Sequence, residues 1–516
     1  MDSLHTAPAA AIAMNRFGLG ARPDEAPPAN PQHWLLDQFA RYEPLPDAWR
    51  GQPGAIALTT RFGEERLQGM SGGALRGPGN DTPASATNNT AGNASPAATN
   101  PAATRPATTQ SASQATAQAA RQAVNQAVNQ AVNRAIRRES VEVYRGAVNA
   151  RLTSALQTDT PFVERLVHFW SNHFAVSVDK PALAGLAGSF EMEAIRPHVL
   201  GKFADLLVAV EQHAAMQIFL DQIRSMGPDS RAALRADARD PVHRRGLNEN
   251  LAREIMELHT LGVRTGYTQA DVTEFARALT GWSVAGVRGP QPGNAAPGAF
   301  VFRPALHEPG TRTVMGRQYG QDGERQALAV LRDLAQAPAT SRHIAFQLAR
   351  HFVADNPPPA LTAHLAQTFE RSGGDLPAVY RALVESPQTW AGAHAKFKTP
   401  WDWTVSSMRA LGWRDRGDLN AAPLLTQLGQ PVWRPGSPAG YDDIAASWAA
   451  PDALVRRVEV AQRLAALVGD RLDPRTLGQS VLPGTLGAPT ATAVAHAESA
   501  QTAVALLLVS PDFLRR

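Results

Sequence analysis

Two imidazoles stand in one aromatic segment of the chain, Glu164-Arg-Leu-Val-His168-Phe-Trp-Ser-Asn172-His173-Phe174. Glu164, His168 and Asn172 are four residues apart and share one face of a helix. His173 lies about 100° further round the same helix. Because buried polar groups need hydrogen-bond partners, a polar stripe within an aromatic helix is unusual. It predicts a metal site or an acid–base site, and the alternative is a satisfied core histidine beside a surface glutamate.

A second segment, Asn248 to Gly262, is crowded with polar residues. Glu249, Arg253 and Glu257 form one row at i, i+4 spacing, and Asn250 and Glu254 form the neighbouring row. His259 follows these rows. Carboxylates paired at this spacing can hold a hard cation or change one another's pKa. The alternative is a solvated helix face held by ion pairs, which is the usual state of such rows.

We expect these two helices to face each other across one site. The predicted catalytic residues are His173, Arg253, Glu254, Glu257 and His259. The predicted ligands of a divalent metal ion are His168, Asn172, His173, Asp221 and Glu257, and the predicted substrate-binding residues are Asn250, Arg277 and His307. A metal held by nitrogen and oxygen ligands would polarise a substrate or activate water. Without a metal, a Glu–His pair would serve as general base, and Arg253 or Arg277 would bind an anionic substrate.

Helical periodicity dominates the elements that must position these residues. Apolar residues recur at spacings of three and four in most segments after residue 139. Strands are predicted only within residues 299–316, where Val301–Arg303 and Thr313–Met315 would form a hairpin around His307 to Gly310. Strand and helix do not alternate, which argues against a Rossmann or barrel enzyme. We therefore predict a mainly α fold, a multi-helix globular body with a small β-hairpin and a disordered low-complexity insertion.

The chain divides by composition into three parts. Residues 1–69 are predicted to be the N-terminal helical part of the body, and residues 117–516 the main helical domain. Between them, residues 70–116 are rich in Ala, Thr, Asn and Pro and nearly lack large apolar side chains, so disorder is predicted. A Gln-Ala-Val-Asn repeat follows and places Val124, Val128 and Val132 on one helical stripe. The stripe favours a low-complexity extension of the next helix, with a coiled-coil contact as the alternative.

The composition excludes several functional classes. The 516 residues contain no Cys, which rules out disulfides, thiolate metal sites and cysteine nucleophiles. A net charge of +4 over this length predicts no nucleic-acid partner. No apolar run reaches the roughly 18 residues of a transmembrane helix, so no membrane span is predicted. The first residues lack a basic region before their apolar stretch. As the sequence is written we expect a cytoplasmic protein, with a periplasmic or exported location as the alternative.

Several of these segments together resemble the Domain of Unknown Function 1800 family of bacterial proteins. The resemblance covers nearly the whole chain outside residues 70–135. The matching motifs are Arg16-Phe-Gly-Leu-Gly-Ala-Arg22-Pro23, His168 to Phe174, His213 to Asp221, Leu247 to Gly262, Tyr267 to Asp271, Arg277 to Trp282, His307 to Gly316, Leu428 to Pro431, Ser437 to Gly440, and Leu508 to Phe513.

The resemblance implies a large, mainly helical protein that is frequently exported and often encoded beside a sulfatase-like protein, also of unknown function. It implies no activity, so two hypotheses stay open. In the first, the chain is an enzyme with a polar His/Asn/Glu site between helices, with or without a divalent metal ion. In the second, it is a structural or assembly protein that acts with the sulfatase-like partner, and the polar residues only fix helix packing. A site should line a cleft, whereas a packing network should be closed and fully hydrogen-bonded.

Overall fold

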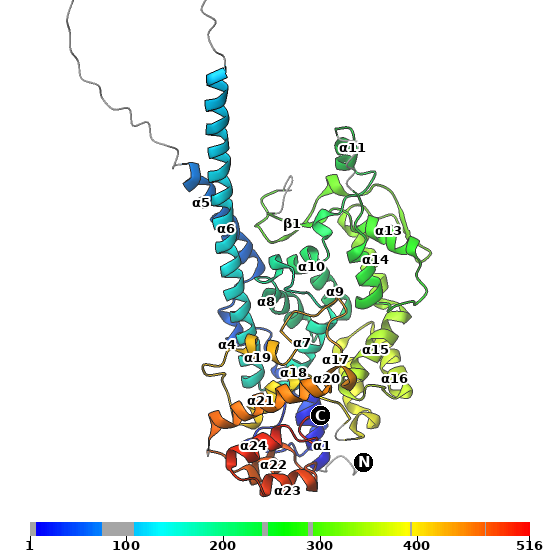
Figure 1. Ribbon diagram of the computed structural model, residues 1–516. Helices are drawn as coiled ribbons and strands as arrows, with labels where there is room; N and C mark the ends of the chain where they lie inside the picture. Colours follow the sequence, from blue (N-terminus) through cyan, green and yellow to red (C-terminus); the bar gives the residue numbers. More distant parts are fainter. Residues whose placement is uncertain (1–6, 75–107, 240–245, 287–292, 393–394, 470) are drawn as a thin grey trace, which may run out of the picture. The chain divides into compact units, whose positions relative to one another are not determined.

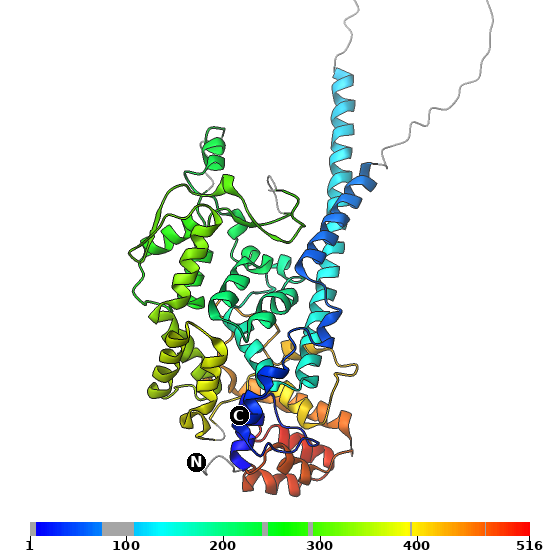
Figure 2. The ribbon, with the colours of Figure 1, turned by 180° about the vertical axis from the view of Figure 1, so that it is seen from behind.

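Helices make up most of the computed structural model, which describes residues 7–74, 108–239, 246–286, 293–392, 395–469 and 471–516 (Figures 1 and 2). The chain falls into two compact units, one of residues 1–59 with 140–516 and one of residues 60–139. No helix within the described ranges is long and apolar enough to cross a membrane. The prediction of a mainly α protein is confirmed.

The smaller unit consists of parts of two long helices, α5 (Ala55–Ala74) and α6 (Thr108–Gln157). Arg61 of α5 and Glu139 of α6 form an ion pair of 3.1 Å. The four-residue repeat lies within α6 and is therefore helical, as predicted. Most of the predicted insertion, residues 75–107, lies outside the described residues, and helix occupies both edges of the predicted range.

The larger unit begins with short helices. Asn30 caps the second α-helix, because its side chain accepts a hydrogen bond from the His33 amide, and Pro31 occupies the first turn. Residues 31–41 are helical, in two pieces that meet at Asp37. These first elements are α1 (Ala7–Ala11), η1 (Ile12–Phe17), α2 (Pro31–Leu36), α3 (Gln38–Arg41) and α4 (Asp47–Arg50).

The helix α7 (Pro161–His173) runs through the interior, and every residue from Pro161 to Ser171 is buried. Its aromatic and aliphatic residues explain that burial, and they carry Glu164, Arg165 and His168 into the core with them. The elements that follow are η2 (Pro181–Leu183), α8 (Ala187–Phe190), η3 (Glu191–Ile195), η4 (Arg196–His198), α9 (Phe203–Gln212), α10 (Ala214–Phe219), η5 (Gln222–Arg224), α11 (Arg231–Asp237), α12 (Asn250–Glu254), η6 (Ile255–His259) and α13 (Gln269–Leu279).

Two small antiparallel sheets, β1 (Trp282–Val284) with β2 (Phe300–Phe302) and β3 (Arg312–Val314) with β4 (Arg317–Tyr319), lie in the described chain. The predicted hairpin between residues 301–303 and 313–315 is therefore wrong, although strands lie in both places. Met315 and Gly316 have φ values of 47° and 76°, which suit a two-residue turn, so β3 pairs with the strand directly after it. The partner of β2 is instead β1, and Trp282 of β1 packs on Phe300 with ring centroids 5.1 Å apart.

The C-terminal half is again helical. Its last helices enclose an apolar core in which α21 (Pro451–Val468) packs on α24 (Ala500–Leu508), as Figure 1 shows in orange and red. Backbone hydrogen bonds in both directions join Lys396 to Arg516, which places the Arg516 side chain in the interior. The other elements are η7 (Pro304–Leu306), α14 (Glu324–Gln336), α15 (Pro338–Phe352), α16 (Pro359–Ser372), α17 (Leu376–Glu385), η8 (Pro387–Trp390), α18 (Pro400–Ala410), α19 (Ala421–Gln427), α20 (Ala445–Trp448), α22 (Pro474–Val481) and α23 (Ala488–Ala495).

Candidate functional site

A cavity of about 310 Å³ lies between α7, α15, the start of α18 and the segment of residues 430–443. Its volume is at the lower end of the range found for small-molecule sites. Its wall carries imidazoles, guanidinium groups and carboxylates together with aromatic rings. The polar residues that line it are Arg151, Arg165, His168, Ser171, Asn172, His173, His343, Gln347, Arg350, His351, Thr399, Asp402, Gln430, Tyr441, Asp442 and Asp443.

The helix α15 contributes four polar side chains to this wall. His343, Gln347, Arg350 and His351 are spaced by four, three and one, so they lie on one side of the helix. The apolar residues of α15 fill the core on the other side. One amphipathic helix thus presents a continuous polar stripe to the cavity.

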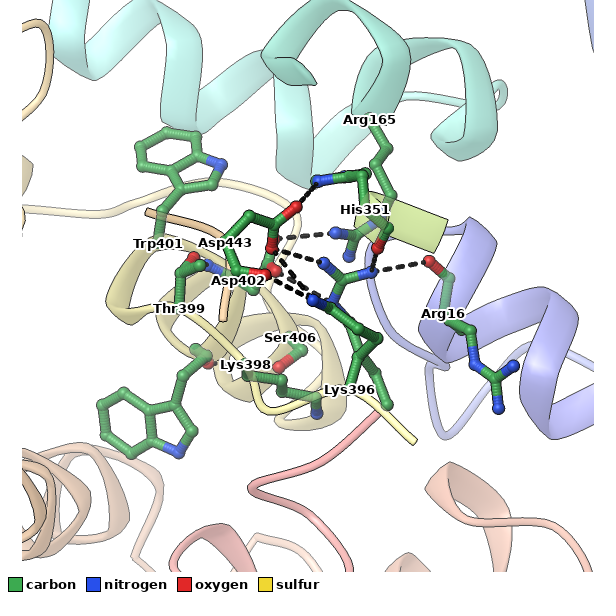
Figure 3. Close-up of polar contacts among 12 residues, drawn as sticks. Arg16, Arg165, His351, Lys396, Lys398, Thr399, Trp401, Asp402, Ser406 and Asp443 are labelled. Carbon is green, nitrogen blue, oxygen red and sulfur yellow. Dashed lines mark hydrogen bonds and ion pairs between the residues drawn. The ribbon is translucent and has the colours of Figure 1, made fainter. Parts of the chain in front are cut away.

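His351 and Asp443 form a dyad at the cavity. His351 Nδ1 lies 2.5 Å from Asp443 Oδ2, and Figure 3 shows the two side chains directed at each other. No described residue hydrogen-bonds His351 Nε2. Burial lowers the pKa of His351, against the opposing effect of Asp443, so the imidazole is neutral at neutral pH. With Nδ1 donating to Asp443, the lone pair stands on Nε2.

The carboxylate of Asp443 is held from the other side by cations. Lys396 Nζ lies 3.6 Å from Asp443 Oδ1 and 2.5 Å from the Asp443 carbonyl oxygen. Arg516 Nη2 lies 3.7 Å from the same Oδ1. Burial alone would raise the pKa of Asp443, but His351, Lys396 and Arg516 lower it below its usual value. Asp443 is therefore ionised and its orientation is set by its surroundings.

Asp402 is closed off by two arginines. Its Oδ1 accepts a hydrogen bond of 2.8 Å from Arg165 Nη1, and its Oδ2 lies 3.0 Å from Arg516 Nε. These two cations hold the pKa of Asp402 below its usual range despite burial. Burial in turn lowers the pKa of Arg165 to about 10. Arg165 also donates to the Gly18 carbonyl at 2.7 Å, so this group ties the start of the chain to α7 and α18.

A second closed network surrounds Glu164, which is 2% exposed. Arg196 makes two bonds to the Glu164 carboxylate, of 2.5 and 3.0 Å, and Ser154 Oγ donates a third of 3.0 Å. His168 Nε2 stands 3.6 Å from Glu164 Oε1, and His168 Nδ1 accepts a bond of 3.1 Å from Trp401 Nε1. Burial lowers the pKa of His168 to about 4, so this imidazole is a neutral packing group.

Asn172 holds a backbone segment in the cavity wall. Its amide donates to the Tyr441 carbonyl at 2.9 Å and accepts from the Tyr441 amide at 2.8 Å. Gly440 has a φ of 78°, and a Cβ there would collide with the backbone oxygen of Asn172. The predicted metal ligand Asn172 is thus engaged on both its oxygen and its nitrogen.

His173 lines the cavity, and its Nε2 lies 3.2 Å from the His259 carbonyl oxygen. Burial, with His343 and His259 nearby, lowers the pKa of His173 well below its usual value. His343 makes the matching contact, 3.1 Å from its Nε2 to the Leu258 carbonyl. Two cavity histidines therefore hold the end of η6.

His259 is not part of the cavity wall, and its side chain pairs with Glu211. His259 Nδ1 lies 2.7 Å from Glu211 Oε1, and both residues are at most 1% exposed. No described residue hydrogen-bonds His259 Nε2. The two helical segments that were predicted to face each other therefore meet where His173 reaches the His259 carbonyl, whereas the His259 side chain pairs with the buried Glu211.

The carboxylates of the second segment lie on a partly exposed face. Arg253 pairs with Glu249 at 3.2 Å and with Glu257 at 3.5 Å, and the three side chains are 27–35% exposed. Glu254 is half-buried, and burial raises its pKa. None of these residues lines the cavity. Their geometry is that of a salt-bridged helix face.

The remaining predicted residues also lie outside the cavity wall. Asp221 accepts a bond of 2.7 Å from Lys180. Arg277 pairs with the buried Glu308 at 2.9 Å, and His307 Nδ1 lies 2.8 Å from the Thr280 carbonyl. Asn250 is exposed at the first turn of α12. The structure therefore brings His168, Asn172 and His173 to one cavity and leaves the other predicted residues elsewhere.

Within the part of the chain that the structure describes, the five predicted metal ligands are not brought together at one site. The described ranges contain no group of three or more His, Cys, Asp or Glu side chains that could hold one. The proposed ligands are engaged separately: His168 with Trp401, Asn172 with Tyr441 and Asp221 with Lys180. Asp443 and the polar stripe of α15 were missed by sequence reasoning. The spacing of the stripe's polar residues in an amphipathic helix is the sequence signal that could have identified it.

Comparison with known proteins finds a family match over almost the entire sequence. The family described as "Protein of unknown function (DUF1800)" matches residues 12–515. No curated protein and no solved structure matches the chain.

Proposed function

We propose that this chain, which belongs to the DUF1800 family of proteins of unknown function, is an acid–base enzyme whose catalytic base is His351. One observation carries the proposal: His351 Nδ1 lies 2.5 Å from Asp443, while its Nε2 has no hydrogen-bond partner among the described residues and the residue lines a cavity. An aspartate that orients an imidazole and stabilises its protonated form is a recurring device of proton-transfer catalysis.

The proposed roles follow from the tautomer. Nε2 of His351 accepts a proton from a water molecule or a substrate hydroxyl, and Asp443 stabilises the imidazolium that forms. No Ser or Thr hydroxyl is hydrogen-bonded to His351 in the described chain. We therefore infer direct activation of water or of the substrate, without a protein nucleophile. In this proposal His173 forms part of the cavity wall, and no step passes through a metal ion.

The test uses the purified full chain and a panel of chromogenic aryl esters, aryl phosphates and aryl glycosides. On any substrate that is turned over, His351→Gln and Asp443→Asn should each lower kcat/KM by about 100-fold or more. His364→Gln makes the same chemical change at an exposed histidine of α16 and should leave kcat/KM unchanged. Circular dichroism and thermal unfolding establish that each variant is folded.

The pH profile supplies a second readout. Because burial lowers the pKa of His351 below 6.5, the acidic limb of kcat/KM should lie below pH 6.5. A folded His351→Gln variant with wild-type activity and an unchanged acidic limb contradicts the proposal.

The alternative is an assembly protein that acts with a sulfatase-like partner. The Glu164–Arg196 and Arg165–Asp402 networks favour it, since their buried charges pair with one another inside the protein, as in a packing device. Co-expression with the sulfatase-like protein and size-exclusion chromatography test this alternative. A stable complex that forms equally well with His351→Gln, together with no turnover of any panel substrate, would favour assembly over catalysis.

A further inference from the structure

We propose that the cavity takes a small molecule with an oxyanion group, a carboxylate or a phosphate, and that Arg350 and Gln347 of α15 bind this group. The inference deepens the proposed function, because it names the substrate class of the same cavity. It rests on a different set of atoms from the His351–Asp443 dyad.

Arg350 is the first part of the argument. Its Nε donates to the Asp355 carbonyl at 3.3 Å, and its guanidinium lies 4.9 Å from the centre of the Phe346 ring. These contacts hold the group in place. Its two terminal nitrogens have no hydrogen bond or ion pair with any described residue, and the residue lines the cavity. Two terminal N–H groups in one plane match the two oxygens of a carboxylate or phosphate.

The other cavity arginines differ from Arg350 in this respect. Arg151 has a carboxylate partner, Glu191, at 2.9 Å. Arg165 has Asp402 at 2.8 Å. A cation that is already paired with a carboxylate has less to gain from a second anion. Among the arginines of the cavity wall, Arg350 therefore has the unmatched charge.

The cavity carboxylates do not compete for Arg350. Asp402 is paired with two arginines, and Asp443 is paired with His351 and with Lys396. Asp442 is exposed and accepts a bond of 2.8 Å from Ser447. Because Asp402 and Asp443 have cationic partners of their own, the positive charge of Arg350 stays available to an incoming anion.

Gln347 supplies an independent second donor. It precedes Arg350 by three residues on the same face of α15, it lines the cavity, and its amide has no hydrogen bond to any residue that the structure describes. The Gln347 amide is not fully buried, so it is open to a ligand or to water. Gln347 also precedes His351 by one turn, so an anion held here lies beside the proposed base.

The size of the cavity limits the rest of the molecule. About 310 Å³ accommodates a small metabolite-sized compound and not a folded polymer domain. The substrate class is therefore a small organic acid or phosphate ester whose anionic group binds Arg350 and whose reacting group lies on the side of His351.

Isothermal titration calorimetry with inorganic phosphate and with acetate, on the full chain at neutral pH, tests the inference. Wild type should bind at least one of the two anions, and which one it prefers assigns the oxyanion as phosphate or carboxylate. Arg350→Gln should weaken that binding by about 10- to 100-fold. Arg350→Lys keeps the charge but loses the paired donors, so it should fall between wild type and Arg350→Gln.

Arg342→Gln is the matched control, since it removes the same charge from an exposed position of α15 outside the cavity. It should bind the anion as wild type does. The inference is overturned if wild type binds neither anion, if Arg350→Gln binds as tightly as wild type, or if Arg342→Gln weakens binding equally. If Arg350→Gln fails to fold, Arg350→Lys decides by the same comparison. Anion binding is measured without turnover, so a failure of the anion site can be distinguished from a failure of the proposed role of His351.

Discussion

Replacing Glu164 by Gln should cost the protein a large part of its stability. The change keeps the shape of the side chain and removes its charge inside the core, where Glu164 is 2% exposed and Arg196 is fully buried. One carboxylate oxygen becomes an N–H donor that faces the guanidinium. Removing one partner of a buried ion pair costs about 3–5 kcal/mol, because the other charge stays buried without its match.

Two features of the structure place the expected loss in that range. Arg196 keeps a second carboxylate, Glu191, but at 3.3 Å this contact is longer than its bonds to Glu164. Because Glu191 still compensates part of the charge of Arg196, we expect a loss near the lower limit, about 3 kcal/mol in the free energy of unfolding. Ser154 retains an acceptor in the glutamine oxygen, so it adds little to the loss.

The assay is equilibrium unfolding in urea, with Glu142→Gln as the matched control. Glu142 makes an ion pair of 3.1 Å with Arg145, but the two side chains are 64% and 50% exposed. Loss of such a pair changes stability by about 0–1 kcal/mol. If Glu164→Gln costs no more than Glu142→Gln, the reasoning about this buried network is refuted.

The pH dependence of the same difference gives a sharper test. Burial alone would raise the pKa of Glu164, but Arg196 and His168 hold it below the usual value of 4.5. A carboxyl with a lowered pKa contributes stability that is present above its unfolded-state value and is lost as the pH falls below that value. The gap between wild type and Glu164→Gln should therefore be widest above pH 4.5 and narrow below it.

Two further predictions concern α7. Asn172→Ala removes both hydrogen bonds to the Tyr441 backbone, at a local cost of about 1–3 kcal/mol. Amide exchange in residues 437–443, measured by hydrogen-exchange mass spectrometry, should therefore accelerate. Unchanged protection would contradict the role of Asn172 in holding this segment. Burial lowers the pKa of His168 from 6.5 to about 4 in the folded protein, so acidification between these values should lower stability. His168→Gln should reduce the change in unfolding free energy with pH, measured by urea unfolding, by about 1.4 kcal/mol per pH unit. An unchanged pH dependence would argue that His168 is already protonated in the folded protein.

The candidate site shows how far residue spacing reaches. The spacing of Glu164, His168 and Asn172 identified a polar face, and His168, Asn172 and His173 do line the cavity. Spacing says which residues share a face but not what packs on that face. Here the partner of Glu164 is Arg196, 32 residues further along the chain, and Asn172 binds the backbone of residue 441.

The same limit explains the residues that were missed. His351 and Asp443 are 92 residues apart, so no local pattern links them. Asp443 lies in a loop, where sequence periodicity carries no signal. By contrast, the rows around Arg253 were recognisable locally because their ion pairs join residues one turn apart.

The amino-acid sequence by itself determined the helical class, the positions of most helices and the segments that become β2 and β3, because these depend on local periodicity and on capping residues such as Asn30. It did not identify β1 or β4. The tertiary structure alone decided which strand pairs with which, since β2 found its partner β1 on the N-terminal side. It also decided which of the polar side chains are satisfied and which face a cavity. Both outcomes depend on contacts between segments that are far apart in the sequence. The free energy of those contacts cannot be inferred from any one segment alone.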